Sequence, residues 1–304
     1  MSDHESLDEH LAHVREAAEA YLKVMDPAIY GEAWSDAIDE ARAEVIAALE
    51  ATHHLTAVDG ALVESGSHAR ALRFLLGPPL SQDQFLLACP DWSKASEKTG
   101  RPLRPEAARA FADAFELWKD PDRAARLDDP ERRRRAIDAT AILIASNSFA
   151  TRKRMRLAKA QEDAAAGVLD DLGFKQINPG LVDSPGAVAD GQYARATQFV
   201  TADGSSQEVD LAVGLSGGRI LALECKVSND RTNSIKRIND VLKKASGWQT
   251  QWGRFVITGA LLQGVFSDKE PRRLLDNRVR IFWSHRLELF REWIAAESAA
   301  AEPD

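Results

Sequence analysis

The most informative segment of the chain, residues 208–227, reads EVDLAVGLSGGRILALECKV. Two apolar runs flank a glycine-rich stretch at 214–218, which predicts two strands joined by a flexible hairpin turn. Successive side chains of a strand alternate between its faces, so Glu224 and Lys226 project from one face and Cys225 from the other. Antiparallel pairing then brings Asp210 beside Glu224. The segment therefore predicts two carboxylates and one ammonium at one edge of a sheet.

These side chains suit the hydrolysis of a phosphodiester. Two carboxylates are hard oxygen ligands for Mg²⁺, an ion that also accepts phosphate oxygens. Such an ion activates water and stabilises the charge that develops on the phosphodiester. A neighbouring lysine can orient that water, help to deprotonate it, or screen the extra negative charge. We expect Asp210 and Glu224 to hold Mg²⁺ and Lys226 to act on the attacking water. The alternative is an exposed strand on which Glu224 and Lys226 merely form an ion pair.

The order of elements around the hairpin predicts an α/β (α+β) core with a mixed central sheet flanked by helices. The periodicity of apolar residues and the turn signals place the elements as follows: a helix at 151–172, strands at 196–201, 208–214 and 219–227, a helix at 233–246, strands at 255–262 and 279–283, and a helix at 287–296.

The first half of the chain is expected to be helical. Apolar residues recur at three- and four-residue steps within 7–22, 38–49, 72–76 and 111–118, and residues 94–105 have the composition of a loop. We therefore expect two domains. Residues 1–147 would form a helical region that clamps a ligand or builds a dimer, and residues 148–304 would carry the sheet.

Composition and charge narrow the class of protein. The 304 residues are 44% hydrophobic and 28% charged, with a net charge of −8, which is typical of a globular protein. No apolar stretch is long enough for a membrane span, the N-terminus lacks a secretory pattern and only two cysteines occur, so we expect a cytoplasmic protein without membrane contact. No nucleotide-binding fingerprint occurs, so no nucleotide cofactor is expected. Residues 226–291 contain 14 basic and 6 acidic residues, and this basic zone could bind a polyanion.

Asp210, Glu224 and Lys226, within this order of elements, resemble the PD-(D/E)xK nuclease superfamily. The resemblance implies a helix before the hairpin with an acidic residue that faces the site, and Glu162 occupies that position. It also implies that the backbone carbonyl of Cys225 assists in holding the metal. One departure from the pattern is Val209, where the superfamily motif has proline.

The segment 226–239, KVSNDRTNSIKRIN, is similar to type II restriction endonucleases of the XamI-like family. This likeness implies a prokaryotic homodimer that cleaves both strands of double-stranded DNA at a short palindrome, of the GTCGAC type. The DNA contacts that it implies, together with two arginines of the preceding long helix, are Ser228, Asn229, Arg231, Asn233, Ser234, Lys236, Arg237, Arg152 and Arg156. On a helix, Asn233, Lys236, Arg237, Asp240 and Lys244 share one flank.

Other interpretations stay open beside this one. The same chemistry fits a repair or recombination nuclease that recognises DNA structure, and the basic zone alone fits a non-catalytic DNA-binding protein. Gly214–Gly218 matches the hydrolase pattern G-x-S-x-G, but that pattern requires a strand followed by a helix. His10 and His13 lack cysteine or carboxylate partners at zinc spacing and are expected on a helix surface, and nothing assigns a role to His285. The arginine run 132–135 is expected to balance the acidic start of its own helix.

Overall fold

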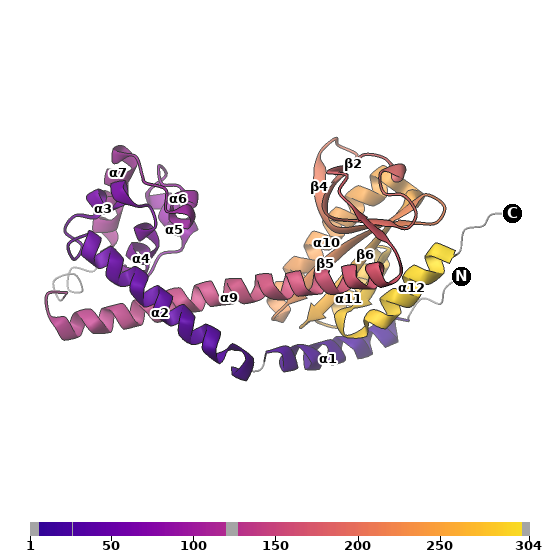
Figure 1. Cartoon of the computed structure of the whole chain (residues 1–304), viewed down its shortest axis with the longest axis horizontal. Coiled ribbons are helices and arrows are strands. Elements are labelled where there is room, and N and C mark those ends of the chain that lie inside the picture. The colour runs from indigo at the N-terminus through magenta and orange to yellow at the C-terminus, as the bar shows by residue number, and fades with distance from the viewer. Residues whose placement is uncertain (1–5, 26, 120–126, 300–304) are drawn as a thin grey trace. The chain divides into compact units, whose positions relative to one another are not determined.

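The computed structural model describes residues 6–25, 27–119 and 127–299 (Figure 1). The chain forms two compact units, which are described separately below. One consists of residues 27–153, and the other of residues 1–26 and 154–304, as far as they are described. No helix in the described part of the chain combines the length and the apolar character that a membrane crossing requires.

The unit at 27–153 is helical, as expected. Its helices are α2 (Pro27–Ala51), α3 (Val58–Glu64), α4 (His68–Leu75), α5 (Gln82–Ala88), α6 (Lys94–Thr99), α7 (Pro105–Trp118) and the first part of α9 (Pro130–Asp171). Phe85 and Phe111 meet in its core with ring centroids 4.4 Å apart. Arg73 and Glu97 form a buried ion pair at 2.7 Å, and the guanidinium of Arg73 lies 5.7 Å from the ring of Trp92, which packs against both phenylalanines. The unit therefore has a hydrophobic core of its own.

Part of the expected loop at 94–105 is helical, which corrects the prediction. The hydroxyl of Ser93 accepts the N–H of Ala95 at 3.2 Å and caps the start of α6. Gly100 ends this helix in the left-handed conformation, at φ +70°. The glycine and prolines of the segment thus mark the end of a short helix.

The other unit is built on a mixed sheet, which confirms the expected fold class. Its strands are β1 (Lys175–Ile177), β2 (Leu181–Val182), β3 (Gln192–Val200), β4 (Ser206–Leu215), β5 (Arg219–Ser228), β6 (Val256–Gly264) and β7 (Val279–Trp283). Their order is β1-β3-β4-β5-β6-β7, with β2 also pairing with β3. The run β3-β4-β5 is antiparallel, whereas β5-β6-β7 is parallel. The central strand β5 therefore joins the two kinds of pairing.

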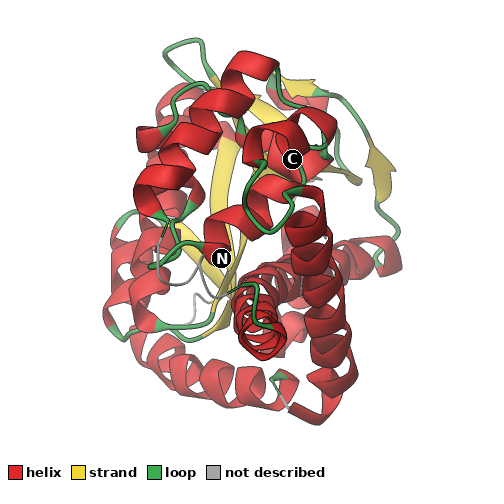
Figure 2. Ribbon diagram, turned by 90° about the vertical axis from the view of Figure 1, so that its left-hand side faces the viewer, coloured by secondary structure: helices red, strands yellow, loops and turns green. Residues whose placement is uncertain are grey.

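Helices pack on both faces of this sheet, whose strands are yellow in Figure 2. The C-terminal part of α9 and helix α12 (Leu287–Ala299) share one apolar cluster with Leu223 of β5 and Leu261 of β6. Helices α10 (Arg231–Trp252) and α11 (Lys269–Asp276) share another cluster with Ala260 and Leu262, which project from the opposite face of β6. Alternation along the strands thus gives each face its own core.

The N-terminal helix α1 (Leu7–Val24) belongs to the sheet unit, not to the helical region as expected. A capping box of Ser6 and Glu9 begins the helix. Its residues Val14 and Ala17 pack into the α10–α11 cluster of the sheet. The other boundary also differs, because α9 begins at Pro130 and continues through the expected boundary at 147–148. The division by sequence therefore misplaced residues 6–25, whose partners lie far along the chain.

Candidate active site

The hairpin of β4 and β5 opens at the predicted site. Paired residues run from Leu215 opposite Arg219 to Leu211 opposite Leu223. Just beyond the last pair, the N–H of Cys225 donates a hydrogen bond to Oδ2 of Asp210 at 2.7 Å. Strand β5 meanwhile continues its pairing with β6. The Asp210 carboxylate is thus held against the backbone of β5 where the two strands of the hairpin separate.

Lys226 brings the two predicted carboxylates together. Its Nζ lies 2.6 Å from Oε2 of Glu224 and 3.2 Å from Oδ2 of Asp210, and Asp240 of α10 approaches to 3.8 Å. Burial of Lys226 opposes its charge, but the attraction of Glu224 and then of Asp210 outweighs burial and raises the pKa of the amine. Lys226 is therefore an ammonium in this arrangement.

Glu224 is completely buried and has a second cationic partner. Both of its oxygens accept hydrogen bonds from Nζ of Lys244, at 2.9 and 3.0 Å, and the same ammonium donates to the carbonyl of Glu208 at 2.7 Å. Burial and then the charge of Asp210 raise the pKa of Glu224, against the lowering effect of Lys226 and Lys244. The carboxylate is thus fixed between two ammonium groups.

Sequence reasoning did not assign Lys244 or Asp240 to this cluster. The four-residue spacing in the sequence predicts only that both lie on the same flank of a helix as the expected DNA contacts Asn233, Lys236 and Arg237. What was missing was the direction of that flank, which depends on how α10 packs against β5. Asp240 and Lys244 lie 14 and 18 residues after Lys226, so no short sequence pattern connects them to the cluster.

Glu162 lies on α9 near the same carboxylates. Its pKa is raised first by burial and then by the charge of Asp210. Arg195 of β3, another residue that the sequence did not single out, comes within 3.9 Å of Glu162 and forms a closer ion pair with Asp163 at 2.5 Å. The preceding residue, Gln161, donates to the carbonyl of Leu261 at 3.0 Å, which ties this turn of α9 to β6.

Cys225 separates the functional residues of β5. Its side chain is buried in the apolar cluster on the α9 face, and burial raises the pKa of its thiol. Its backbone N–H orients Asp210. The metal contact expected of its carbonyl remains a prediction.

The donor set fits a hard divalent cation. Asp210, Glu224 and Glu162 offer only oxygen atoms, the ligand type that Mg²⁺ prefers. The raised pKa values of Glu162 and Glu224 include repulsion from Asp210 as a cause, second only to burial. A cation among these carboxylates would relieve that repulsion.

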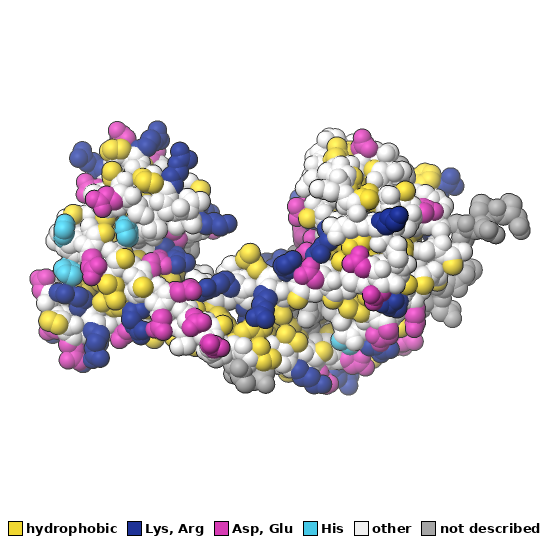
Figure 3. Space-filling model, viewed as in Figure 1, with side chains coloured by type: hydrophobic (Ala, Val, Ile, Leu, Met, Phe, Trp, Pro, Cys, Tyr) yellow, Lys and Arg dark blue, Asp and Glu magenta, His cyan; other side chains and the backbone are white. Residues whose placement is uncertain are grey.

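The residues expected to contact DNA divide by exposure. Asn229, Arg231, Asn233, Lys236 and Arg156 are exposed, and Arg237 is half-buried. The exposed ones lie in the β5–α10 connection, in the first turns of α10 and on α9. Basic side chains are visible along the middle of α9 in the space-filling view (Figure 3).

Two of the expected DNA contacts, Ser228 and Ser234, are buried and form hydrogen bonds within the chain. The hydroxyl of Ser228 donates to the carbonyl of Asp230 at 2.8 Å, and that of Ser234 donates to Oε1 of Glu270 at 3.0 Å. In this conformation both serines support the local fold. Arg152 lies in the helical unit and forms an ion pair with Glu40 at 3.0 Å.

The G-x-S-x-G match at 214–218 is a hairpin turn, as expected. Gly217 and Gly218 have φ values of +75° and +67°, which glycine adopts without strain. A strand precedes and a strand follows. The strand-to-helix turn of a serine hydrolase is therefore absent here.

Comparisons with known proteins show what the chain as a whole is similar to. The sequence profile of the family described as XamI restriction endonuclease matches residues 53–283. The type II restriction enzyme XamI of Xanthomonas campestris pv. amaranthicola is 32% identical over 194 residues, which is 60% of this chain and 67% of that enzyme. A crystal structure of a Vibrio cholerae protein aligns with a TM-score of 0.32 and 11% identity, over 86% of this chain and 57% of that chain, and this likeness is too low to support an inference.

Proposed function

The chain belongs to the XamI restriction endonuclease family, and we propose that it cleaves double-stranded DNA at a short palindrome, of the GTCGAC type, as a Mg²⁺-dependent PD-(D/E)xK enzyme. Family membership makes DNA the partner and a DNA-cleaving hydrolase the class of enzyme. The observation that carries the finer proposal is the meeting of Asp210 and Glu224 at the ammonium of Lys226.

Each residue of the cluster has a role in this proposal. Asp210, Glu224 and the carbonyl of Cys225 would hold Mg²⁺, with Glu162 supporting the same site or a second metal. The ion would stabilise the negative charge that develops on the phosphodiester during cleavage. Lys226, whose pKa is raised by Glu224 and Asp210 in the absence of an ion, would donate hydrogen bonds that orient the attacking water or a phosphate oxygen. Lys244 fixes the carboxylate of Glu224.

The exposed residues at the start of α10 would contact DNA. Asn233 and Arg237 have side chains that read base edges, whereas Lys236 and Arg231 suit phosphates. A palindrome has twofold symmetry, so cleavage of both strands calls for two copies of the site, and we propose a homodimer. The helical unit would clamp DNA or form the dimer contact. The enzyme would act in the cytoplasm of a prokaryote.

A plasmid digest with the full chain and Mg²⁺ tests this function. We expect discrete fragments with one common end sequence, and no cleavage in EDTA. Asp210→Asn and Lys226→Ala should each lower the cleavage rate by about 10²-fold or more, the loss typical of removing one group that stabilises the transition state. Asp183→Asn and Lys243→Ala, which change the same residue types at exposed positions, are the matched controls and should cleave normally.

The alternative outcomes are distinct. End-trimming, a smear or cuts confined to branched DNA would contradict the restriction activity and favour a structure-specific nuclease. Binding of DNA without cleavage in any divalent metal would favour a non-catalytic protein. Cleavage that survives both substitutions would show that the active site lies elsewhere.

A further inference from the structure

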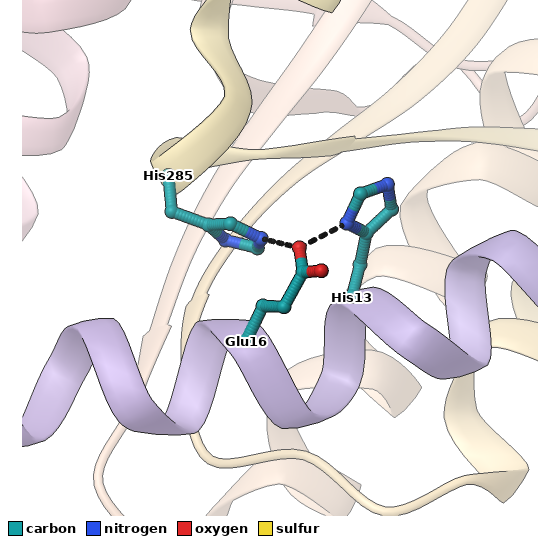
Figure 4. Close-up of side chains that lie close together, drawn as sticks. All are labelled: His13, Glu16 and His285. Atoms are coloured by element: carbon teal, nitrogen blue, oxygen red, sulfur yellow. Dashed lines mark hydrogen bonds and ion pairs between the residues drawn. The ribbon is translucent and has the colours of Figure 1, made fainter.

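A second cluster of ligand-type side chains lies away from the hairpin, on α1 and on the turn after β7. His13 and Glu16 are three residues apart on α1, so they share one face of the helix. His285 belongs to the short helical turn η3 (Ser284–Arg286) that follows β7. Both imidazoles point at the same carboxylate oxygen (Figure 4). The cluster therefore joins two segments that are 269 residues apart.

The distances in this cluster are close to those of a metal site. Oε2 of Glu16 lies 2.9 Å from Nδ1 of His13 and 3.2 Å from Nε2 of His285. Within the described residues, these three form a group whose ligand atoms all lie within 4.8 Å of one another. Ligands held about 2.1 Å from a tetrahedral zinc ion are separated from one another by about 3.4 Å. Small shifts of the side chains would admit an ion at the centre.

Packing holds the two histidines in place and leaves the carboxylate accessible. The side chains of His13 and His285 are 8% and 14% exposed, whereas that of Glu16 is 49% exposed. The ring of Trp283 lies 6.2 Å from that of His13 and 5.9 Å from that of His285, measured between centroids. Trp283 is itself buried and donates from its indole nitrogen to Nδ1 of His10 at 3.2 Å. An ion can thus enter from the side of Glu16 and meet two ordered imidazoles.

We propose that His13, Glu16 and His285 bind a divalent transition-metal ion of the zinc class, which fastens α1 to the turn that follows β7. Two imidazole nitrogens and one carboxylate favour zinc over Mg²⁺, which prefers oxygen ligands alone. Three protein ligands leave one position for water. The site is thus chemically distinct from the all-oxygen donor set at the hairpin.

The role of the ion follows from where α1 packs. Val14 and Ala17 of this helix lie in the same apolar cluster as Trp283. A metal bond to His13 and Glu16 on one side and to His285 on the other adds a cross-link beside that cluster. Zinc binding should therefore stabilise the folded chain, because only the folded chain brings the three ligands together.

Metal binding by the full chain tests this inference. The protein, purified without a histidine tag and stripped with EDTA, would be titrated with Zn²⁺ in the presence of millimolar Mg²⁺, which occupies oxygen sites. We expect one zinc per chain by calorimetry and a rise in melting temperature on the order of 5 °C at saturating zinc. Co²⁺ in place of zinc should give the visible absorption of a four-coordinate nitrogen and oxygen site.

Two variants and two controls locate the ion. Glu16→Gln and His285→Asn should each weaken zinc binding at least tenfold and abolish the rise in melting temperature. His53→Asn changes an exposed histidine of the helical unit, Asp210→Asn changes the hairpin site, and both should bind zinc normally. Melting in EDTA shows whether each variant folds, and the isosteric Glu16→Gln stays informative if His285→Asn does not. Absence of binding at micromolar zinc, or equal binding by the wild type and both ligand variants, would overturn the proposal.

Discussion

The carboxylate of Glu224 is completely buried, and it nevertheless has charged partners. A buried charge is costly unless it is paired, and the two ammonium groups of Lys226 and Lys244 supply that pairing. Lys226 contacts Asp210 as well, whereas Lys244 contacts only Glu224 among the predicted catalytic side chains. The two lysines can therefore be tested separately, one for catalysis and one for the support of Glu224.

Lys244→Met should destabilise the protein by about 1–3 kcal/mol, because it leaves a buried carboxylate with one cationic partner. The methionine keeps most of the length of the side chain, so little packing is lost. Urea unfolding followed by circular dichroism measures the change. Lys243→Met, on the exposed neighbouring residue, should leave the free energy of unfolding nearly unchanged, and equal effects of the two substitutions would contradict this role.

Glu162→Gln should stabilise the metal-free protein above pH 4.5. Burial and then Asp210 raise the pKa of Glu162 above its ordinary 4.5. A raised pKa in the folded state makes a contribution to stability that is fully present below the unfolded pKa and is lost as pH rises through the folded pKa. Glutamine removes that loss, so in EDTA the urea midpoint should fall less between pH 4.5 and pH 8 in the variant than in the wild type.

Added Mg²⁺ should make the wild type more stable than the Glu162→Gln variant, the reverse of the order expected in EDTA. The ion would stabilise the wild type at pH 8 more than it stabilises Glu162→Gln, because the variant lacks one negative charge near the site. Glu19→Gln, at an exposed position of α1, should respond to Mg²⁺ as the wild type does. If Mg²⁺ stabilised all three proteins equally, Glu162 would not belong to the cation site.

At the residue scale, local rules were sufficient for the centre of the site and insufficient for its surroundings. Strand alternation and one hairpin place Asp210, Glu224 and Lys226 together, and all three lie within 17 residues. Lys244 and Arg195 reach the cluster from α10 and β3. Their positions depend on how those elements pack, which no short pattern specifies.

At the scale of elements, β4 shows how closely the hairpin is fitted to its neighbours. A Cβ atom at Gly214 would lie 2.0 Å from the carbonyl oxygen of Ala189 and 2.7 Å from that of Val188. This glycine is therefore required by the close approach of another segment of backbone. The turn itself depends on Gly217 and Gly218.

Gly214→Ala should destabilise the protein by about 2 kcal/mol or more, because the added methyl group displaces the backbone at 188–189. Gly167→Ala is the matched control, since nothing lies within 4 Å of the added atom in α9. There the same substitution should stabilise by about 0.5–1 kcal/mol through helix propensity. Thermal or urea unfolding of the two variants should thus show changes of opposite sign, and two changes of the same sign would contradict this account.

Strands β3 to β7 were predictable from the sequence, whereas β1, β2 and the start of α9 were not. Strand β7 was expected at its observed bounds, and β5 to within one residue. Strands β1 and β2 have three and two residues in a glycine- and proline-bearing stretch and form only by pairing with β3. The start of α9 was placed 21 residues late, although the Asp129 carboxylate that accepts the N–H groups of Glu131 and Arg132 is a recognisable cap.

At the scale of the whole molecule, the placement of α1 was beyond the reach of sequence patterns. Its apolar stripe predicted a helix, but the cluster that receives Val14 and Ala17 is made by residues from 238 onward. The sheet unit therefore combines residues from both ends of the described chain. The same distance along the chain hid the partnership of His13 and Glu16 with His285.

The distribution of charge over the molecule predicts how DNA binding depends on salt. The chain as a whole carries a net charge of −8, so attraction to DNA must come from local basic groups, such as those in the zone 226–291. Each phosphate that is neutralised contributes about −0.9 to the slope of log affinity against log salt. In an Asp210→Asn background, Arg231→Ala with Lys236→Ala, the two residues proposed to contact phosphates, should weaken binding and make this slope shallower by about 2.

The matched control changes the net charge by the same amount elsewhere. Arg134 and Arg135 are exposed and pair with Glu131 of their own helix, at 3.6 and 2.8 Å. If only the total charge mattered, Arg134→Ala with Arg135→Ala would weaken DNA binding as much as the α10 double variant does. The slope of log affinity against log salt, measured at 50–200 mM salt, would then change equally in the two double variants. We expect instead a nearly unchanged slope for this control, measured by fluorescence anisotropy on a duplex that carries the cleavage site mapped from the plasmid digest. Equal slopes for the two double variants would show that the start of α10 does not face the DNA backbone.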